Sequence, residues 1–127
     1  MGSGTSIGRV RGLGSAKEGT HHWWRQRLTA ASNLLLMLWF IFSVARMTGY
    51  DHATVHAWLR SSWVAVPMIL LIVSVFYHFR LGLQVVIEDY QHDQAKVAAM
   101  LALNLFTVAT AATAIFAILK VAFGAAA

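Results

Sequence analysis

The sequence predicts an all-α integral membrane protein with three transmembrane helices. Of its 127 residues, 58% are hydrophobic and only 12% are charged, and the mean hydropathy is +0.61. A soluble domain usually carries about 25% charged residues, so this composition suits a bilayer rather than water. Three crossings of about 20 residues each use roughly half the chain and leave no room for a soluble catalytic domain. Any chemistry must therefore occur within the membrane or in a partner.

Residues 1–26 are expected to form a basic N-terminal arm with an interfacial end. The first 20 residues are rich in glycine and serine and show no hydrophobic period that would build a helix or a strand. Residues 21–27 combine tryptophans with cations directly before an apolar run, a mixture typical of the headgroup zone. We therefore expect an extended arm whose last residues lie at a membrane surface.

Residues 27–127 form the predicted transmembrane domain. Its first span, approximately residues 28–47, is almost free of charge and long enough to cross a hydrocarbon layer of about 30 Å. The second, residues 63–90, would be roughly 40 Å long as a helix, so its polar far end should protrude or the helix should tilt. The polar residues 48–62 between these spans are expected to be partly helical along the interface.

The third span, residues 97–123, is rich in alanine and threonine. Ala109, Thr113 and Ala117 follow one another at four-residue spacing, which allows helix backbones to approach closely. We expect this side of the helix to pack against protein, as part of a heteromeric helix bundle.

The distribution of cations predicts the orientation. Five of the ten Lys and Arg residues lie in the first 27 residues, whereas the first loop holds only Arg46 and Arg60. Because cations resist translocation, the N-terminus should be cytoplasmic and, after three crossings, the C-terminus periplasmic. The formal charge of +5 thus indicates orientation in a membrane, not nucleic-acid binding. The absence of cysteine excludes disulfides, thiolate catalysis and cysteine-ligated iron–sulfur clusters from this chain.

His78 is the strongest candidate functional residue, because an ionisable side chain inside a spanning helix is costly unless a partner, cofactor or water meets it. With Leu71, Ser74, Gly82, Val85 and Asp89 it forms one stripe along the second span, expected to face inward. An imidazole is a common axial ligand of haem iron, and a glycine one turn away leaves space for a flat macrocycle. Another functional role, or a histidine hydrogen-bonded to a neighbouring helix beside a close-packing glycine, remains open.

Other polar residues are weaker candidates. Tyr90, beside Glu88 and Asp89, could donate a hydrogen bond to a quinone carbonyl, or could be an aromatic-belt residue before a solvated helix end. Arg25 and Arg27 could pair with a carboxylate, or could serve orientation alone. The remaining histidines are expected at the surfaces, and the helical spacing of His52 and His56 without a third ligand favours an interfacial turn over a metal site. Polar groups in the first and third spans, among them Thr29, Ser43, Asn104 and Thr107, are expected to make interhelical hydrogen bonds.

Two segments carry a resemblance to a known family. Residues 78–90, HFRLGLQVVIEDY, and residues 22–30, HWWRQRLTA, resemble the smaller hydrophobic membrane anchor of succinate dehydrogenase, respiratory complex II. The likeness extends over nearly the whole chain: a basic arm, three spans, and a histidine followed eleven residues later by Asp-Tyr. The H-x₃-G…D-Y pattern is its most specific part.

The resemblance implies that His78 is this anchor's axial ligand to haem b, with the other ligand from the second membrane anchor, the cytochrome b subunit. It also implies that Tyr90 binds ubiquinone, that Asp89 supports that site, and that Arg27 lies near the haem propionates and the quinone. A flavoprotein and an iron–sulfur subunit would deliver electrons from succinate at the inner membrane. Alone the chain should catalyse nothing. The alternatives are a haem-free anchor or assembly protein, and a small proton or solute conductor using His78 and Asp89.

Overall fold

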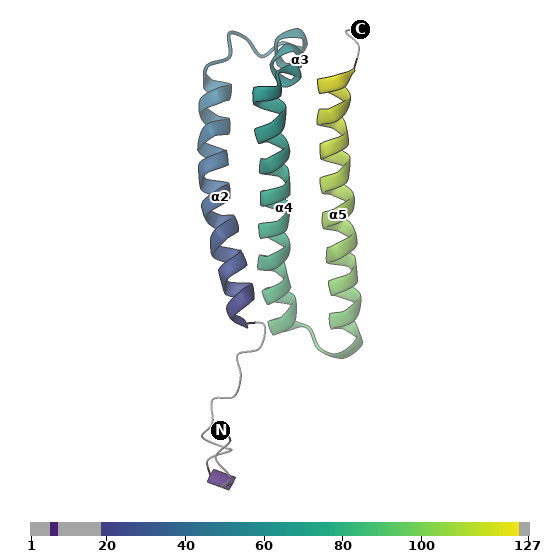
Figure 1. The fold of residues 1–127 in the computed structure, drawn as a ribbon. Coiled ribbons are helices and arrows are strands. Elements are labelled where there is room, and N and C mark those ends of the chain that lie inside the picture. Colours follow the sequence, from purple (N-terminus) through teal and green to yellow (C-terminus); the bar gives the residue numbers. More distant parts are fainter. Residues whose placement is uncertain (1–5, 8–18, 125–127) are drawn as a thin grey trace.

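A computed structural model describes residues 6–7 and 19–124. Within this part of the chain the structure is helical, with three long helices and one short one (Figure 1). The long helices are α2 (Gly19–Ala45), α4 (Ser62–Tyr90) and α5 (Asp93–Phe123), and α3 (His52–Arg60) is the short one. Most of the expected N-terminal arm, with Arg9, Arg11 and Lys17, lies outside the described residues.

The three long helices are each long and apolar enough to cross a membrane, with mean hydropathies of 1.9, 2.0 and 2.0 in their most apolar windows. This confirms the predicted all-α membrane fold. The helix boundaries differ most at α2, which begins at Gly19 and therefore includes the tryptophan- and histidine-containing segment expected at the surface. Indoles and cations place a segment near headgroups, but they do not prevent it from being helical.

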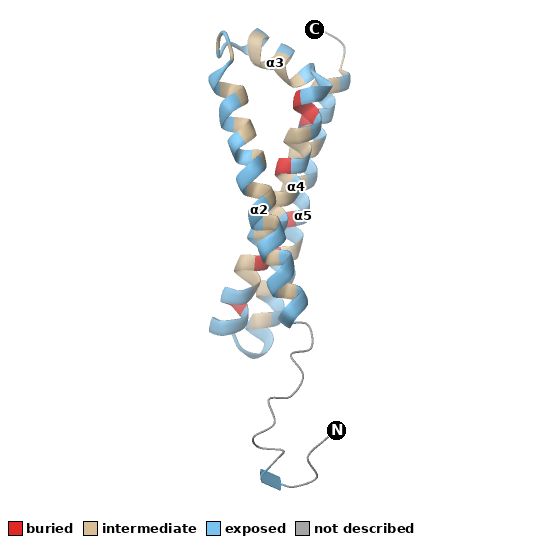
Figure 2. Ribbon diagram, turned by 60° about the vertical axis from the view of Figure 1, so that its left-hand side comes forward, coloured by how far each residue is buried: buried red, intermediate tan, exposed pale blue. Residues whose placement is uncertain are grey.

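The helices lie side by side with α4 between α2 and α5 (Figure 1). The start of α2 and the short α4–α5 connection lie at one end, and α3 and the end of α5 at the other (Figure 1). Figure 2 shows that buried residues are concentrated on α4 and α5, and no residue of α2 is fully buried. Helix α2 is thus the least buried of the three long helices.

The short helix α3 closes the end of the row that lies opposite the α4–α5 connection. Its N-cap is Asp51, whose carboxylate accepts hydrogen bonds from the Thr54 amide at 3.1 Å and the Thr54 hydroxyl at 2.6 Å. These bonds hold the pKa of the Asp51 carboxyl below its usual value. The Trp58 indole donates to the Ser43 hydroxyl at 3.0 Å, which fixes α3 to the end of α2.

Candidate functional site

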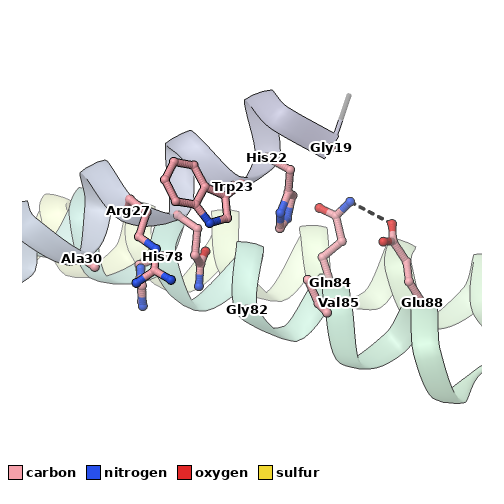
Figure 3. A pocket seen from close by; sticks show the side chains of 11 residues that line it. Gly19, His22, Trp23, Arg27, Ala30, His78, Gly82, Gln84, Val85 and Glu88 are labelled. Carbon is pink, nitrogen blue, oxygen red and sulfur yellow. Dashed lines mark hydrogen bonds between the residues drawn. The ribbon is translucent and has the colours of Figure 1, made fainter. Parts of the chain in front are cut away.

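A cavity of about 800 Å³ lies between the first half of α2 and the last half of α4 (Figure 3). These parts of α2 and α4 are at the end of the molecule where α4 ends and α5 begins (Figure 1). Its walls are formed by Gly19, His22, Trp23, Gln26, Arg27 and Ala30 of α2 and by His78, Gly82, Gln84, Val85 and Glu88 of α4.

His78 is held against α2 by one side-chain contact. Its Nδ1 lies 3.0 Å from the hydroxyl oxygen of Thr29. That hydroxyl also lies 2.9 Å from the Arg25 carbonyl and 3.1 Å from the Gln26 carbonyl, which can only accept. A hydroxyl has a single proton, so when Thr29 donates it to one of these carbonyls, the remaining bond is donated by Nδ1–H of His78. In that tautomer Nε2 of His78 is unprotonated, as in a metal-ligating imidazole.

Gly82, one helical turn beyond His78, leaves open space in the cavity wall. A Cβ built at this position would meet only Nε2 of Gln26, at 3.7 Å, which is an ordinary van der Waals contact. Packing within this chain therefore does not require glycine here. The missing side chain instead leaves room for a flat molecule beside His78.

One face of α2 carries a polar stripe, formed by His22, Gln26, Thr29 and Asn33, of which His22 and Gln26 line the cavity. These residues are four, three and four positions apart and so share one helix face. Nε2 of His22, Oε1 of Gln26 and Oδ1 of Asn33 are buried without a hydrogen-bond partner. Buried polar atoms in native proteins nearly always have partners, so the described residues leave the hydrogen-bonding capacity of this stripe incompletely satisfied.

The predicted site residues divide into two groups. His78 and Arg27 line the cavity, and the Arg27 guanidinium lies over the Trp23 ring, 5.5 Å from its centroid. Asp89 and Tyr90 do not line it; both are exposed at the end of α4, and Tyr90 is 77% exposed. The stripe expected to face inward does so at Leu71, which is buried, but opens to the outside at Val85 and Asp89.

Among the cavity residues that sequence reasoning did not predict are three with polar side chains, His22, Gln26 and Gln84. His22 was expected at the surface, but it is half-buried and lines the cavity, because α2 already begins at Gly19. Gln26, one turn further on, and Gln84, which donates to Glu88 at 2.9 Å, complete the walls (Figure 3). Helical periodicity extended back to residue 19 would have placed His22 and Gln26 on the face of Thr29.

The expected interhelical hydrogen bonds are present in part. Ser74 donates to the Thr29 carbonyl at 3.5 Å, and Asn104 of α5 accepts from Arg80 of α4 at 2.6 Å. The Thr107 hydroxyl, in contrast, donates within its own helix. Ala109, Thr113 and Ala117 are exposed, so their packing against another protein remains a prediction.

No group of three or more His, Cys, Asp or Glu residues that could hold a free metal ion occurs among the residues that the structure describes. A single imidazole with a free Nε2, a glycine and unpartnered polar atoms instead suit a metal carried by its own macrocycle. The free nitrogen would ligate the iron, and the glycine would accept the ring. The donor set in this cavity therefore fits haem.

Comparisons with known proteins agree with this architecture. Residues 1–113 match the family described as Succinate dehydrogenase/Fumarate reductase transmembrane subunit. The chain is 32% identical over 113 residues to the succinate dehydrogenase hydrophobic membrane anchor subunit of Rickettsia bellii, covering 88% of this chain and 90% of that one. It is 31% identical over 116 residues to the protein of the same name from Paracoccus denitrificans, covering 91% and 90%. No solved structure gives a significant match.

Proposed function

The chain belongs to the family of succinate dehydrogenase and fumarate reductase transmembrane subunits, and on that premise we propose that it shares a haem b with a second anchor and helps to bind ubiquinone. It is the membrane-anchor subunit of a succinate dehydrogenase. Its proposed partners are the cytochrome b membrane anchor, the iron–sulfur subunit and the flavoprotein. Its proposed location is the bacterial cytoplasmic membrane, with a cytoplasmic N-terminus and a periplasmic C-terminus.

The observation that carries the haem proposal is the contact between His78 and Thr29. The 3.0 Å contact between Nδ1 and the Thr29 hydroxyl holds the ring of His78, which lines the cavity, by one nitrogen and leaves Nε2 available as a ligand. A hydrogen bond at the second nitrogen is the usual arrangement for a metal-ligating histidine. The haem would supply one-electron redox chemistry at this position.

If His78 holds a haem, a second histidine ligand would come from another subunit, because the other histidines near this end of the chain are far from His78 along the helices. His22 shares the cavity, but it lies seven residues before Thr29, or about 10 Å along α2 by helix rise. His92 follows the end of α4, fourteen residues from His78 and about 21 Å away.

Replacing His78 tests the haem proposal. We expect the purified complex carrying His78→Ala to lose most of its haem b absorbance while the flavoprotein and iron–sulfur subunits remain bound. The matched control is His92→Ala, which removes an exposed histidine outside the cavity. An unchanged haem spectrum in the His78 variant would instead favour a haem-free anchor with a structural histidine.

The quinone proposal rests on Tyr90 and Asp89, with Arg27 nearby on the same side of the membrane. The 77% exposure of Tyr90 supports it, since a largely exposed side chain is accessible to a substrate held by the other subunits. A tyrosine hydroxyl can donate to a quinone carbonyl, and a neighbouring carboxylate can orient a cation or relay a proton during reduction.

We expect Tyr90→Phe to impair ubiquinone reduction while succinate oxidation by a soluble acceptor survives. Equal loss of both activities would contradict the role of Tyr90 in quinone binding.

A small conductor remains the contrasting function, and it predicts proton or solute flux through liposomes that contain this chain alone. We expect no flux.

A further inference from the structure

Arg80 lies on the side of α4 that faces away from His78. Arg80 follows His78 by two positions, which on an α-helix corresponds to a rotation of about 200°. The two side chains therefore leave α4 on nearly opposite sides. Arg80 is half-buried against α5, where its Nε donates to the Asn104 side-chain oxygen at 2.6 Å. The function proposed above does not use this charge.

The charge of Arg80 is met only by neutral groups in these contacts. Besides Asn104, its Nη1 lies 3.5 Å from Oε1 of Gln84, also an uncharged amide. A guanidinium has five N–H donors, so three remain available. A cation in a membrane-spanning helix is costly unless it reaches the interface or meets an opposite charge.

Arg80 stands at one end of an apolar groove between α4 and α5. The groove has a volume of about 180 Å³ and is lined by Val73, Phe76, Tyr77, Thr107, Val108 and Ala111 besides Arg80 itself. Val108 is 69% and Val73 49% exposed, so the groove is open along its length. From Arg80 it extends away from the Tyr90 end of α4, toward the centre of the membrane.

Arg80 lies just inside the hydrocarbon layer, close enough to its edge for the long side chain to extend to the lipid phosphates. Trp63, 88% exposed at the opposite end of α4, suits the aromatic belt on that side. A hydrocarbon layer of about 30 Å measured from Trp63 ends about 20 residues later, near Leu83. Arg80 thus lies about 4.5 Å inside this boundary, and its contact with Gln84, one turn further out, directs the guanidinium toward the headgroups.

We propose that this groove binds one anionic phospholipid, with an acyl chain between α4 and α5 and the phosphate on Arg80. Charge complementarity favours this occupant, because a guanidinium pairs with phosphate through two parallel hydrogen bonds. The mostly apolar lining fits a hydrocarbon chain. The groove lies on the α5 side of α4 and the haem cavity on its α2 side, and Gln84, which lines the cavity, also accepts from Arg80.

Lipid binding to the purified complex tests the proposal. The complex is delipidated in mild detergent and titrated with phosphatidylglycerol or phosphatidylcholine of identical chains, and bound lipids are counted by native mass spectrometry. Arg80→Gln should lower the preference for phosphatidylglycerol about fivefold, since one cation near an anionic lipid contributes about 1 kcal/mol. Ala111→Phe, which fills the groove and leaves Arg80 in place, should reduce binding of both lipids.

Arg60→Gln is the matched control, because this exposed arginine ends α3 at the opposite side of the molecule. It should leave the preference unchanged. The proposal is contradicted if Arg80→Gln changes the preference for phosphatidylglycerol over phosphatidylcholine by less than twofold. Loss of a partner subunit from that variant, with lipid preference intact, assigns the charge to a carboxylate of the partner and also contradicts it. If the Arg80 variant does not assemble, unchanged lipid binding by Ala111→Phe is decisive against the groove.

Discussion

The two interfaces of α4 are built differently. Toward α5, the contact includes buried apolar residues such as Leu103, a Phe79–Phe106 ring pair with centroids 6.3 Å apart, and the Arg80–Asn104 hydrogen bond. Toward α2, no α2 residue is fully buried, and three buried polar atoms lack partners. The α4–α5 interface is therefore satisfied within one chain, whereas the α2–α4 interface leaves buried polar atoms unpartnered among the described residues.

The largest expected effect follows from filling the α2–α4 cavity. Gly82→Leu should abolish haem incorporation, because the cavity has space for the new side chain only where we place the ring. Helix α4 itself should persist, since leucine favours helix over glycine by about 1 kcal/mol. The measurement is haem absorbance per assembled complex.

Ala102→Leu is the control for added volume, because Ala102 is exposed on α5. It should leave haem content unchanged. Normal haem content in the Gly82 variant would show that the cavity is not the haem site, whatever the role of His78.

A smaller effect is expected when the orientation of His78 is weakened and the cavity is left intact. Thr29→Val keeps the shape of the side chain and removes the acceptor 3.0 Å from Nδ1. Loss of such a partner typically lowers metal affinity or activity about 10- to 100-fold. Haem retention during dilution or competition measures this loss.

Thr113→Val controls for the loss of a threonine hydroxyl, because Thr113 donates only to the Ala109 carbonyl of its own helix, at 2.8 Å. Equal haem retention in both variants would mean that the Thr29 hydroxyl does not orient a ligand.

The α4–α5 interface should respond in stability and not in haem content. Asn104→Leu removes the 2.6 Å acceptor of Arg80. Hydrogen bonds between transmembrane helices contribute about 0.6 kcal/mol on average, and up to about 1.7 kcal/mol. We expect a modest fall in the melting temperature of the complex, measured by thermal unfolding, with a normal haem spectrum. Thr107→Val, which loses only hydrogen bonds within α5, should lower the melting temperature less. Haem loss in Asn104→Leu would contradict the separation of the two interfaces.

The same contrast explains what could be predicted from sequence. Hydropathy reports which segments cross the membrane, so three helices were foreseen, and a 100° turn per residue was enough to place His78 and Gly82 on one face. The role of His22 was missed because its position depends on α2 starting at Gly19, within a segment whose composition indicates only nearness to headgroups. The pairing of Arg80 with Asn104 depends on how α4 and α5 are rotated about their axes, which neither helix encodes alone.

The smallest expected effect lies outside both interfaces, at the cap of α3. Hydrogen bonds from Thr54 lower the pKa of the Asp51 carboxyl, so the ionised form is favoured more in the folded protein than in the unfolded chain. The cap therefore contributes stability at pH values above the ordinary pKa of 3.8 and loses it as the pH falls through the lowered value.

Amide hydrogen exchange in α3 should be unchanged between pH 7 and pH 5, after correction for intrinsic rates, and should rise in Asp51→Ala. Asp51→Asn keeps an acceptor and should remain protected, because asparagine is also a good N-cap. Haem content should be normal in both variants, because α3 lies at the opposite end of the helices from the residues that line the cavity. Haem loss in Asp51→Ala alone would show that the α3 end and the cavity are coupled along α4.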